Sequence, residues 1–399
     1  MNKLTLNKLD VDGKRVIMRV DFNVPIKDGI VEDDTRIVAA LPSIQYVLDN
    51  GGSLILISHC GRPKGEKNME FTLKPAADRL AELIDANITL APDVIGDDVQ
   101  SLVNSLKSGE ILILENIRFY KEEEGKGCSS EDQEIFAKTL ASYGDIYVSD
   151  AFGTAHRAHA SMSVITKYID ICAAGFLLEK EITYLGKVLE SPEHPFVAII
   201  GGAKISGKID VIMNLMDKCE TILIGGGMAY TFYAAQGLQI GDSLLEEDKI
   251  DLAREILTQA KEKGVELLLP VDHIVADSFS EDANIKEVDG EIESGWMALD
   301  IGPKTAALYS KAVSMAKTVV WNGPMGCFEM TPFSNGTNEV CAAVASSNSV
   351  SIIGGGDSVS AVKKAGVADK MSHVSTGGGA SLEFMEGKQL PGIISLTDS

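Results

Sequence analysis

The sequence is poor in basic residues and has no long apolar run. Its 399 residues include 36 Lys and Arg against 58 Asp and Glu, for a net charge of −22. Nucleic-acid binding usually needs a basic face that displaces counterions, so this balance argues against a nucleic-acid partner. A local cationic cleft could still bind a small phosphorylated metabolite. No apolar run approaches the roughly 18 residues of a membrane span, so we expect no membrane partner.

The cysteines form neither a metal-binding nor a disulfide pattern. Six are scattered at positions 60, 128, 172, 219, 327 and 341, with no Cys-x-x-Cys pair. Residues 1–8 contain no apolar signal core. We therefore expect a protein of the reducing cytoplasm. With 45% hydrophobic and 24% charged residues the chain is typical of globular proteins, and its length favours two domains.

Short apolar runs recur along the chain, and each is followed by a polar or glycine-rich turn. Stretches with helical spacing lie between them, for example Leu73, Ala77, Leu80 and Leu83. This alternation predicts an α/β fold of two doubly wound, Rossmann-like parallel-sheet domains that face a central cleft. The predicted strands are 16–20, 54–57, 111–114, 146–148, 197–200, 222–224, 267–269, 319–321 and 350–353.

A helix is expected to join the two domains. Leu178, Ile182, Leu185 and Leu189 form one apolar stripe, which should end before the prolines of 191–195. We expect an N-terminal domain over 1–173, a connecting helix over 174–191 and a C-terminal domain over 192–388. A tail over about 389–399 should pack back on the first domain.

The middle of the chain, 195–209, indicates a phosphate site. A buried strand leads through Gly201 and Gly202 into the start of a helix, with Lys204 and Lys208 beside the turn. Glycines let the backbone approach a phosphate, and a helix N-terminus favours its charge. Residues 202–208 match a P-loop until the last position, where Ile209 replaces the Ser or Thr that would hold magnesium.

The residues that follow the predicted strands differ between the two halves. The first half offers Arg, His, Asp and Asn side chains, which suit a small, doubly anionic acid. The second half offers glycine runs, whose backbone N–H groups suit the phosphates of a nucleotide. Such residues can also be surface groups or caps, and for Asp357 helix capping and metal contact both remain open. The acidic runs 122–124 and 246–248 are expected to be solvated faces.

Eight of these segments occur together in one known family. They are Arg19–Pro25, Ser58–Pro63, Glu115–Phe119, Asp150–His159, Gly201–Lys204, Trp321–Pro324, Gly354–Ser358 and Ser375–Ala380. In these motifs and their order the chain resembles phosphoglycerate kinase over essentially its whole length. The resemblance implies reversible phosphoryl transfer between 1,3-bisphosphoglycerate and ADP, giving 3-phosphoglycerate and ATP, with Mg²⁺ as cofactor. It also implies a monomer.

The resemblance further implies which residues form the two half-sites. Arg36 would lie beside the reacting carboxyl, Lys204 would move with the phosphoryl group, and the backbone of Gly356 and of 377–379, including Gly379, would stabilise it. The 3-phosphoglycerate site would comprise Asp21, Asn23, Arg36, His59, Arg62, Arg118 and Arg157. The nucleotide site would comprise Lys208, Gly226, Asn322, Glu329, Gly355, Gly356, Asp357 and Ser358, with Asp357 on the magnesium.

These residue types suit an in-line phosphoryl transfer, which needs positioning and positive charge more than a covalent nucleophile. Met325 and Cys327 depart from the small aliphatic residues expected there, but neither would supply the chemistry. Two alternatives belong to other classes. One is a non-catalytic two-domain protein that closes on a phosphorylated ligand. The other is a P-loop ATPase, which Ile209 disfavours.

Overall fold

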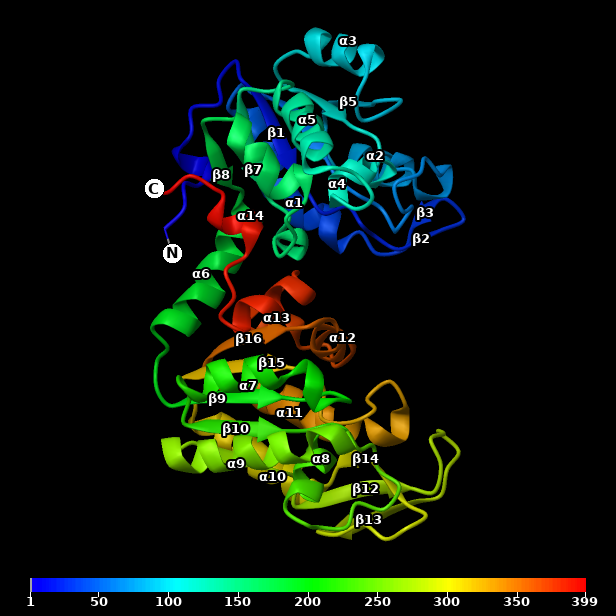
Figure 1. The fold of residues 1–399 in the computed structure, drawn as a ribbon, viewed down its shortest axis with the longest axis vertical. Coiled ribbons are helices and arrows are strands. Elements are labelled where there is room, and N and C mark those ends of the chain that lie inside the picture. Colours follow the sequence, from blue (N-terminus) through cyan, green and yellow to red (C-terminus); the bar gives the residue numbers. More distant parts are fainter. Residues whose placement is uncertain (1) are drawn as a thin grey trace. The chain divides into compact units, whose positions relative to one another are not determined.

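The computed structural model describes residues 2–399, and the chain forms two compact units. Unit 1 comprises Met1–Thr183 together with the tail Gln389–Ser399, and unit 2 comprises Tyr184–Lys388. Helix α6 (Phe176–Glu190) carries the chain from one unit into the other (Figure 1). It ends one residue before Ser191, as the prolines that follow predict.

Unit 1 is built on a six-stranded sheet in the order β5-β6-β4-β1-β7-β8. All five neighbouring pairs are parallel, so the strands end at one edge. The four runs predicted in this half are confirmed as strands within one residue, and the two outer strands were not predicted. The strands are β1 (Arg15–Arg19), β4 (Ser53–Ile57), β5 (Asn87–Leu90), β6 (Glu110–Ile113), β7 (Ile146–Ser149) and β8 (Cys172–Ala174).

Helices cover both faces of this sheet. Alternate residues of β1 and β4, such as Val16, Met18 and Leu56, share a core with α1 (Thr35–Asp49) and α2 (Lys74–Leu83). Helix α5 (Ser130–Ala141) lies on the other face (Figure 1). The remaining short elements are β2 (Ile26–Lys27), β3 (Ile30–Val31), α3 (Asp97–Ser105), α4 (Lys121–Glu124) and α14 (Pro391–Ile394).

Unit 2 repeats the architecture with different connections. Its main sheet has the order β11-β10-β9-β15-β16-β17, again with every pair parallel. The five runs predicted here are confirmed as strands, so the predicted α/β class with two parallel sheets is confirmed. The strands are β9 (Phe196–Ile200), β10 (Thr221–Ile224), β11 (Glu266–Leu268), β15 (Thr318–Asn322), β16 (Val350–Gly354) and β17 (His373–Val374).

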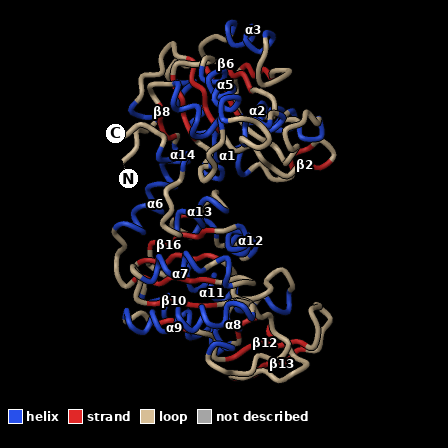
Figure 2. The backbone as a smooth tube through the Cα atoms, viewed as in Figure 1, coloured by secondary structure: helices blue, strands red, loops and turns tan. Residues whose placement is uncertain are grey.

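The core of unit 2 is centred on Trp321, whose side chain is fully buried. One face of the sheet packs on α10 (Pro303–Met315), α11 (Asn335–Ser346) and α12 (Gly356–Lys364). Helices cover the other face as well, as the tube in Figure 2 shows. These are α7 (Ile209–Met216), α8 (Ala229–Ala235), α9 (Ile250–Lys263) and α13 (Gly379–Met385).

A second, antiparallel sheet in unit 2 was not predicted. Strand β12 (Asp272–Ala276) pairs with β13 (Ile285–Asp289) on one side and with β14 (Met297–Ile301) on the other. It has a small core of its own around Val275 and Ile292. Its strands carry charged and polar residues among the apolar ones, so no apolar run marks them.

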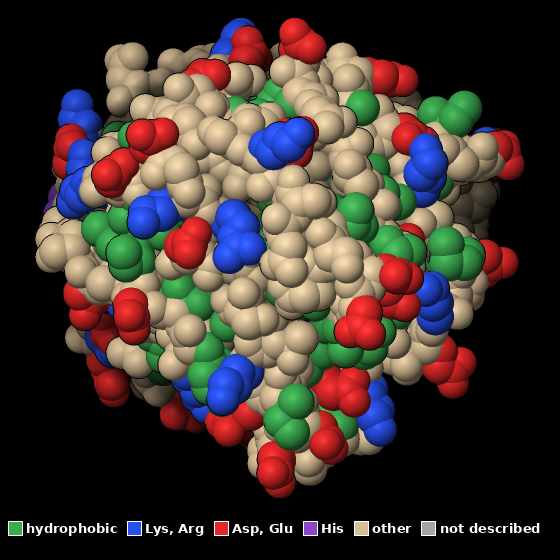
Figure 3. All heavy atoms as spheres, turned by 90° about the horizontal axis from the view of Figure 1, so that it is seen from above, with side chains coloured by type: hydrophobic (Ala, Val, Ile, Leu, Met, Phe, Trp, Pro, Cys, Tyr) green, Lys and Arg blue, Asp and Glu red, His purple; other side chains and the backbone are tan. Residues whose placement is uncertain are grey.

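The surface carries both signs of charge, and in one acidic run the prediction of a solvated face is wrong. On the face shown in Figure 3, acidic and basic side chains are interspersed and hydrophobic groups are small and separate. Glu123, in the run 122–124, is 0% exposed. None of the helices in residues 2–399 has both the length and the apolar character needed to cross a bilayer.

Candidate functional site

The strand order of unit 1 gathers the polar motifs at one sheet edge. Strands β6, β4, β1 and β7 are consecutive neighbours and parallel, so the residues that follow them lie at the same edge. Those residues include Arg118 after β6, His59 and Arg62 after β4, Asp21 after β1 and Arg157 after β7. Ligands bind beyond the carboxyl ends of the strands in such sheets.

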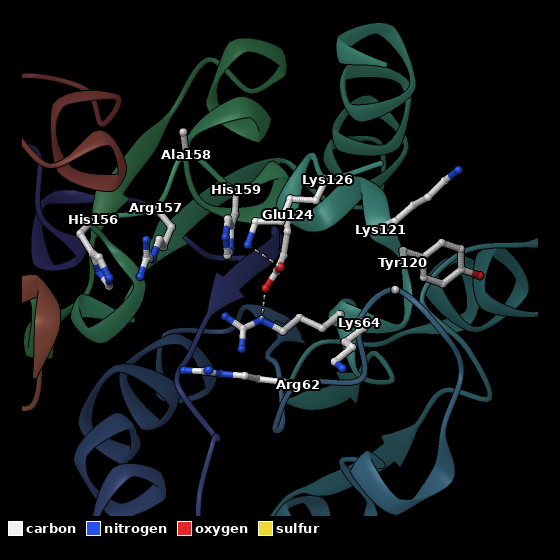
Figure 4. A pocket seen from close by; sticks show the side chains of 12 residues that line it. Arg62, Lys64, Tyr120, Lys121, Glu124, Lys126, His156, Arg157, Ala158 and His159 are labelled. Carbon is white, nitrogen blue, oxygen red and sulfur yellow. Dashed lines mark hydrogen bonds and ion pairs between the residues drawn. The ribbon is translucent and has the colours of Figure 1, made fainter. Parts of the chain in front are cut away.

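A cavity of about 740 Å³ opens at this edge, and its lining is strongly cationic. Three of the predicted arginines, Arg62, Arg118 and Arg157, line it. In Figure 4 the side chains of Arg62, Arg157 and His159 point toward a common space. The other lining residues are Lys64, Gly65, Tyr120, Lys121, Glu124, Lys126, His156 and Ala158. Guanidinium groups form paired hydrogen bonds to phosphate and carboxylate oxygens, so the cavity suits a doubly anionic ligand.

Arg118 is held from two sides. Its Nη1 donates to the carbonyl oxygen of Gly61 at 2.9 Å, and its Nε lies 3.2 Å from the Glu124 carboxylate. Burial lowers the pKa of the guanidinium, whereas the charge of Glu124 raises it. An arginine remains charged in either case. The side chain is therefore presented to the cavity as a fixed cation.

Asp21, Asn23 and Arg36 form a second group, outside the lining of the large cavity. Arg36 Nη1 donates to the carbonyl oxygen of Asn23 at 2.9 Å and lies 3.1 Å from the Asp21 carboxylate. The Asn23 side-chain oxygen accepts from Gly61 N at 2.9 Å. Since Gly61 also bonds Arg118, these contacts tie the second group to the wall of the cavity.

His59 is buried behind the cavity and does not line it. Its Nδ1 lies 3.2 Å from Nη2 of Arg19, a buried arginine that the sequence analysis did not single out. Burial lowers the pKa of the His59 imidazole well below its ordinary value, and the charges of Arg19, Arg118 and Arg36 add to the effect. His59 is thus neutral in this environment, and the structure gives it no direct exposure to the cavity.

In unit 2 the loops after three neighbouring strands meet backbone to backbone. A Cβ on Gly201 would lie 2.0 Å from the Pro324 carbonyl oxygen. Gly226 has φ +69°, and a Cβ there would lie 2.5 Å from the carbonyl oxygen of Gly202. Only glycine permits this close approach, so the packing of these loops against one another already requires glycine, whether or not a ligand binds there.

Two cavities lie beside these loops. The smaller, of about 230 Å³, is lined by Lys208, Asn322, Gly323, Gly355, Gly356, Asp357, Ser358, Gly378, Gly379 and Leu382. The larger, of about 470 Å³, is lined mainly by apolar and glycine residues, with Gly226, Cys327 and Glu329 among them. Asp357 lines both. A polar cavity beside an apolar one suits the phosphates and the base of a nucleotide.

Lys208 and Asn322 line the smaller cavity side by side. The Lys208 ammonium donates to the side-chain oxygen of Asn322. Burial lowers the pKa of Lys208, while the charges of Asp357 and Glu386 oppose the shift. The buried Nδ2 of Asn322 finds no hydrogen-bond acceptor within residues 2–399. A donor left in this state indicates a place for an anionic ligand oxygen.

The remaining predicted residues of unit 2 have varied positions. Lys204 is exposed and lines neither of the two cavities. The Ser358 hydroxyl is buried and accepts from Gly323 N at 2.5 Å, so it anchors the neighbouring loop. Helix α12 begins at Gly356 with Gly355 at its N-cap position, so the capping alternative for Asp357 is wrong. Its carboxylate lies in the first turn instead.

The donor set at Asp357 fits a magnesium ion. Mg²⁺ takes oxygen ligands and is commonly bound by one or two carboxylates together with substrate phosphates and water. Asp357 supplies one exposed carboxylate at the boundary of the two cavities. Ile209, in the position of a P-loop hydroxyl, provides no ligand, so Asp357 would be the protein's contribution.

The sequence analysis missed the residues that support the side chains of the cationic cavity. Arg19 lay inside a recognised motif but was given no role, and Glu123 and Glu124 were assigned to a solvated face. Glu123 contacts His159 and Ser161, and Glu124 contacts Arg118. The local sequence does not mark Glu123, because its partners His159 and Ser161 lie far along the chain.

Known proteins resemble this chain over its whole length. The phosphoglycerate kinase family model matches residues 6–388. A phosphoglycerate kinase of Chloroherpeton thalassium is 55% identical over 404 aligned positions, covering 100% of both chains. One of Clostridium botulinum (strain Hall) is 52% identical over 400 positions, covering 100% of this chain and 99% of its own.

Solved structures agree with the sequence relatives. The phosphoglycerate kinase from Coxiella burnetii superimposes with a TM-score of 0.89 at 41% identity, and 98% of each chain is covered. That from Pyrococcus horikoshii OT3 has a TM-score of 0.83 at 33% identity, also with 98% of each chain covered. The matches in sequence and in structure both extend over the two units and their glycine-rich and cationic edges, and the chain belongs to the phosphoglycerate kinase family.

Proposed function

We propose that each unit binds one of the two substrates. The phosphoglycerate binds in the cavity of unit 1, and the nucleotide binds in the two cavities of unit 2. The activity itself follows from the family. The chain is a phosphotransferase with a carboxyl acceptor, and it transfers a phosphoryl group reversibly between 1,3-bisphosphoglycerate and ADP to give 3-phosphoglycerate and ATP. The observation that supports this assignment is the cationic cavity of about 740 Å³ in unit 1, with Arg62, Arg118 and Arg157 in its wall.

In unit 1 the proposed roles follow the geometry. Arg62, Arg118 and Arg157 hold the non-reacting phosphate, since they line the cavity together. Asp21 and Asn23 hold the hydroxyl and carboxylate end. Arg36, bonded to both and 40% exposed, is available to the reacting carboxyl group. His59 supports this wall from behind.

In unit 2 the smaller cavity receives the nucleotide phosphates and the larger one the base. Lys208, Asn322 and the N-terminal N–H groups of α12 contact the phosphates, with Gly355, Gly356 and Ser358 shaping the loop. Gly226 and Glu329 border the base and sugar. Lys204 and the backbone at Gly379 act on the transferred group. The exposure of Lys204 suits a residue that moves with that group.

Magnesium is the proposed cofactor, held by Asp357 and the nucleotide phosphates. When bound, it would neutralise charge on the phosphate oxygens. Side chains of the protein supply the rest of the binding and the positive charge. Lys208 fixes the nucleotide, and Arg36 and Lys204 place positive charge where the transferred group needs it.

Three finer proposals concern the working state of the enzyme. Transfer needs both substrates to meet with water excluded, so we propose a hinge-bending closure when both are bound. We also propose a monomer, which light scattering can test. The cytoplasm is the proposed location, supported by six free cysteines. Closure predicts a smaller radius of gyration in X-ray scattering with both substrates than with either alone.

The direct test is a coupled assay with 3-phosphoglycerate, ATP and Mg²⁺. The wild type should release ADP only when the acid is present, and Arg36→Ala and Lys204→Ala should each be slower by about 10²–10³. A folded wild-type protein without turnover would support the non-catalytic binder instead. ADP release without 3-phosphoglycerate would support a P-loop ATPase.

A further inference from the structure

A chain of buried polar contacts lies behind the cationic cavity. Ser161 donates to Glu123 twice, from its backbone N at 2.9 Å and from its hydroxyl at 2.7 Å. The same hydroxyl accepts from Nε of Arg19 at 2.9 Å. Arg19 in turn places Nη2 3.2 Å from Nδ1 of His59. The contacts thus connect α4 to the end of β1 and to the segments that follow β4 and β7.

Glu123 is the anionic centre of this network. Its other neighbour is His159, whose Nδ1 lies 3.5 Å from its carboxylate and whose side chain lines the cavity. Burial disfavours ionisation of Glu123. The contact with His159, the charge of Arg19 and the hydrogen bond from Ser161 outweigh burial and hold the pKa of Glu123 below its ordinary value. A fully buried carboxylate needs such partners, since an isolated buried charge is costly.

The network also fixes the state of His59. A guanidinium group only donates hydrogen bonds, so Nδ1 of His59 must accept from Arg19. The neutral ring then carries its proton on Nε2. Arg19 itself is held by Ser161, by the carbonyl oxygen of Val20 and by its burial, with 1% of its surface exposed. The imidazoles of His59 and His159 therefore depend on Glu123, the first through Arg19 and Ser161 and the second directly.

We propose that Glu123 is a positioning residue for the phosphate-binding wall of unit 1. It fixes His159 directly, and it fixes Arg19 and His59 through the Ser161 hydroxyl. This inference rests on the proposed assignment of the cavity to phosphoglycerate. Glu123 is fully buried and does not line the cavity, so it acts only through its neighbours.

Whether removal of Glu123 weakens or tightens substrate binding distinguishes a positioning role from a simple effect of its charge. Glu123 is negative and lies close to a site for an anion, so on charge alone its removal should tighten binding. If Glu123 orders the wall, its removal should weaken binding, because His159 and Arg19 lose the group that holds them. A role in stability alone would change the melting temperature and leave the affinity of the folded protein unaltered.

The test uses Glu123→Gln, which keeps the shape but removes the charge. Glu122→Gln is the matched control, since it removes the same charge one residue away without a place in the network. For Glu123→Gln we expect the KM for 3-phosphoglycerate and its Kd by calorimetry to rise about tenfold, the size of one lost charged hydrogen bond. The KM for ATP should stay within about twofold of wild type, while Glu122→Gln should bind 3-phosphoglycerate as the wild type does.

A second variant keeps the inference testable if Glu123→Gln does not fold. Ser161→Ala leaves the carboxylate with His159 but cuts its link to Arg19, so we expect a smaller rise in the same KM. Unchanged or tighter binding in the folded variants overturns the proposal, as does an equal rise in both KM values. The proposed function fails separately, if the wild type shows no turnover of 3-phosphoglycerate.

Discussion

The ammonium group of Lys208 donates to the side-chain oxygen of Asn322, which reaches it from the end of the central strand β15. This pair places a half-buried cation and an unsatisfied amide donor at the wall of one small cavity. Within residues 2–399, no carboxylate forms an ion pair with the Lys208 ammonium. The pair is therefore prepared for an anion that the protein itself does not provide.

We expect Lys208→Met to raise the KM for ATP by about tenfold or more. Methionine keeps the packing of the long side chain but removes the charge, and a hydrogen bond to a charged group contributes about 1.5–3 kcal/mol. The KM for 3-phosphoglycerate should change little. Steady-state kinetics with each substrate varied in turn measure both values. The control is Lys311→Met, an exposed lysine on α10, and an equal response of the two variants would contradict the prediction.

Asp357→Asn should raise the Mg²⁺ concentration needed for half-maximal activity by about tenfold. The substitution retains an oxygen ligand but loses the charge that Mg²⁺ prefers. Titration of Mg²⁺ at fixed ATP measures the change. Asp369→Asn, an exposed aspartate outside both cavities, is the control. An unchanged Mg²⁺ requirement in Asp357→Asn would remove Asp357 from the metal site.

Gly201→Ala should destabilise the fold by about 1–3 kcal/mol or more. The added methyl would lie 2.0 Å from the Pro324 carbonyl oxygen, and backbone on both sides leaves it no room to shift. Gly207→Ala is a matched control six residues on, where a methyl meets nothing within 4 Å and φ is not positive. Thermal unfolding should distinguish the two. Equal melting temperatures would show that the contact between the loops relaxes freely.

The sequence was a good guide wherever burial follows a local pattern. All nine apolar runs are strands, because a parallel strand covered on both faces must be apolar along its length. The antiparallel strands β12 and β13 escaped detection because they lie outside that core. Strand β13 alternates between exposed and half-buried residues, and β12 contains Asp272 and His273.

The site was predictable in its type of chemistry but not in its supporting residues. Arg62 and Arg118 follow strands, and strand ends meet at one edge, so their meeting could be expected from topology. Glu123 could not be found in this way. Its carboxylate is buried by Ser161, 38 residues further along the chain, and no pattern within 122–124 reveals such a partner.

The last prediction concerns Asp150, which is fully buried at the start of the loop that carries Arg157. One carboxylate oxygen accepts from the N–H groups of Leu177 and Leu178 at the start of α6, at 2.9 and 3.1 Å. Burial raises the pKa of Asp150 to about 6, although the hydrogen bonds from Ser43 and from these N–H groups lower it. The folded state therefore binds this proton more tightly than the unfolded state does.

The sign of the pH dependence follows from this raised pKa. Its contribution to stability is complete below the unfolded pKa of about 3.9 and is lost as the pH rises through about 6. Between pH 5 and 7 the wild type should lose about 1–2 kcal/mol of unfolding free energy relative to Asp150→Asn, which cannot ionise. Chemical unfolding of both proteins across this range measures the difference, with the exposed Asp170→Asn as control.

Parallel stability curves for wild type and Asp150→Asn would show that Asp150 does not titrate in this window. A steeper decline in the variant would mean that ionised Asp150 stabilises the start of α6, through its N–H groups, by more than burial costs it.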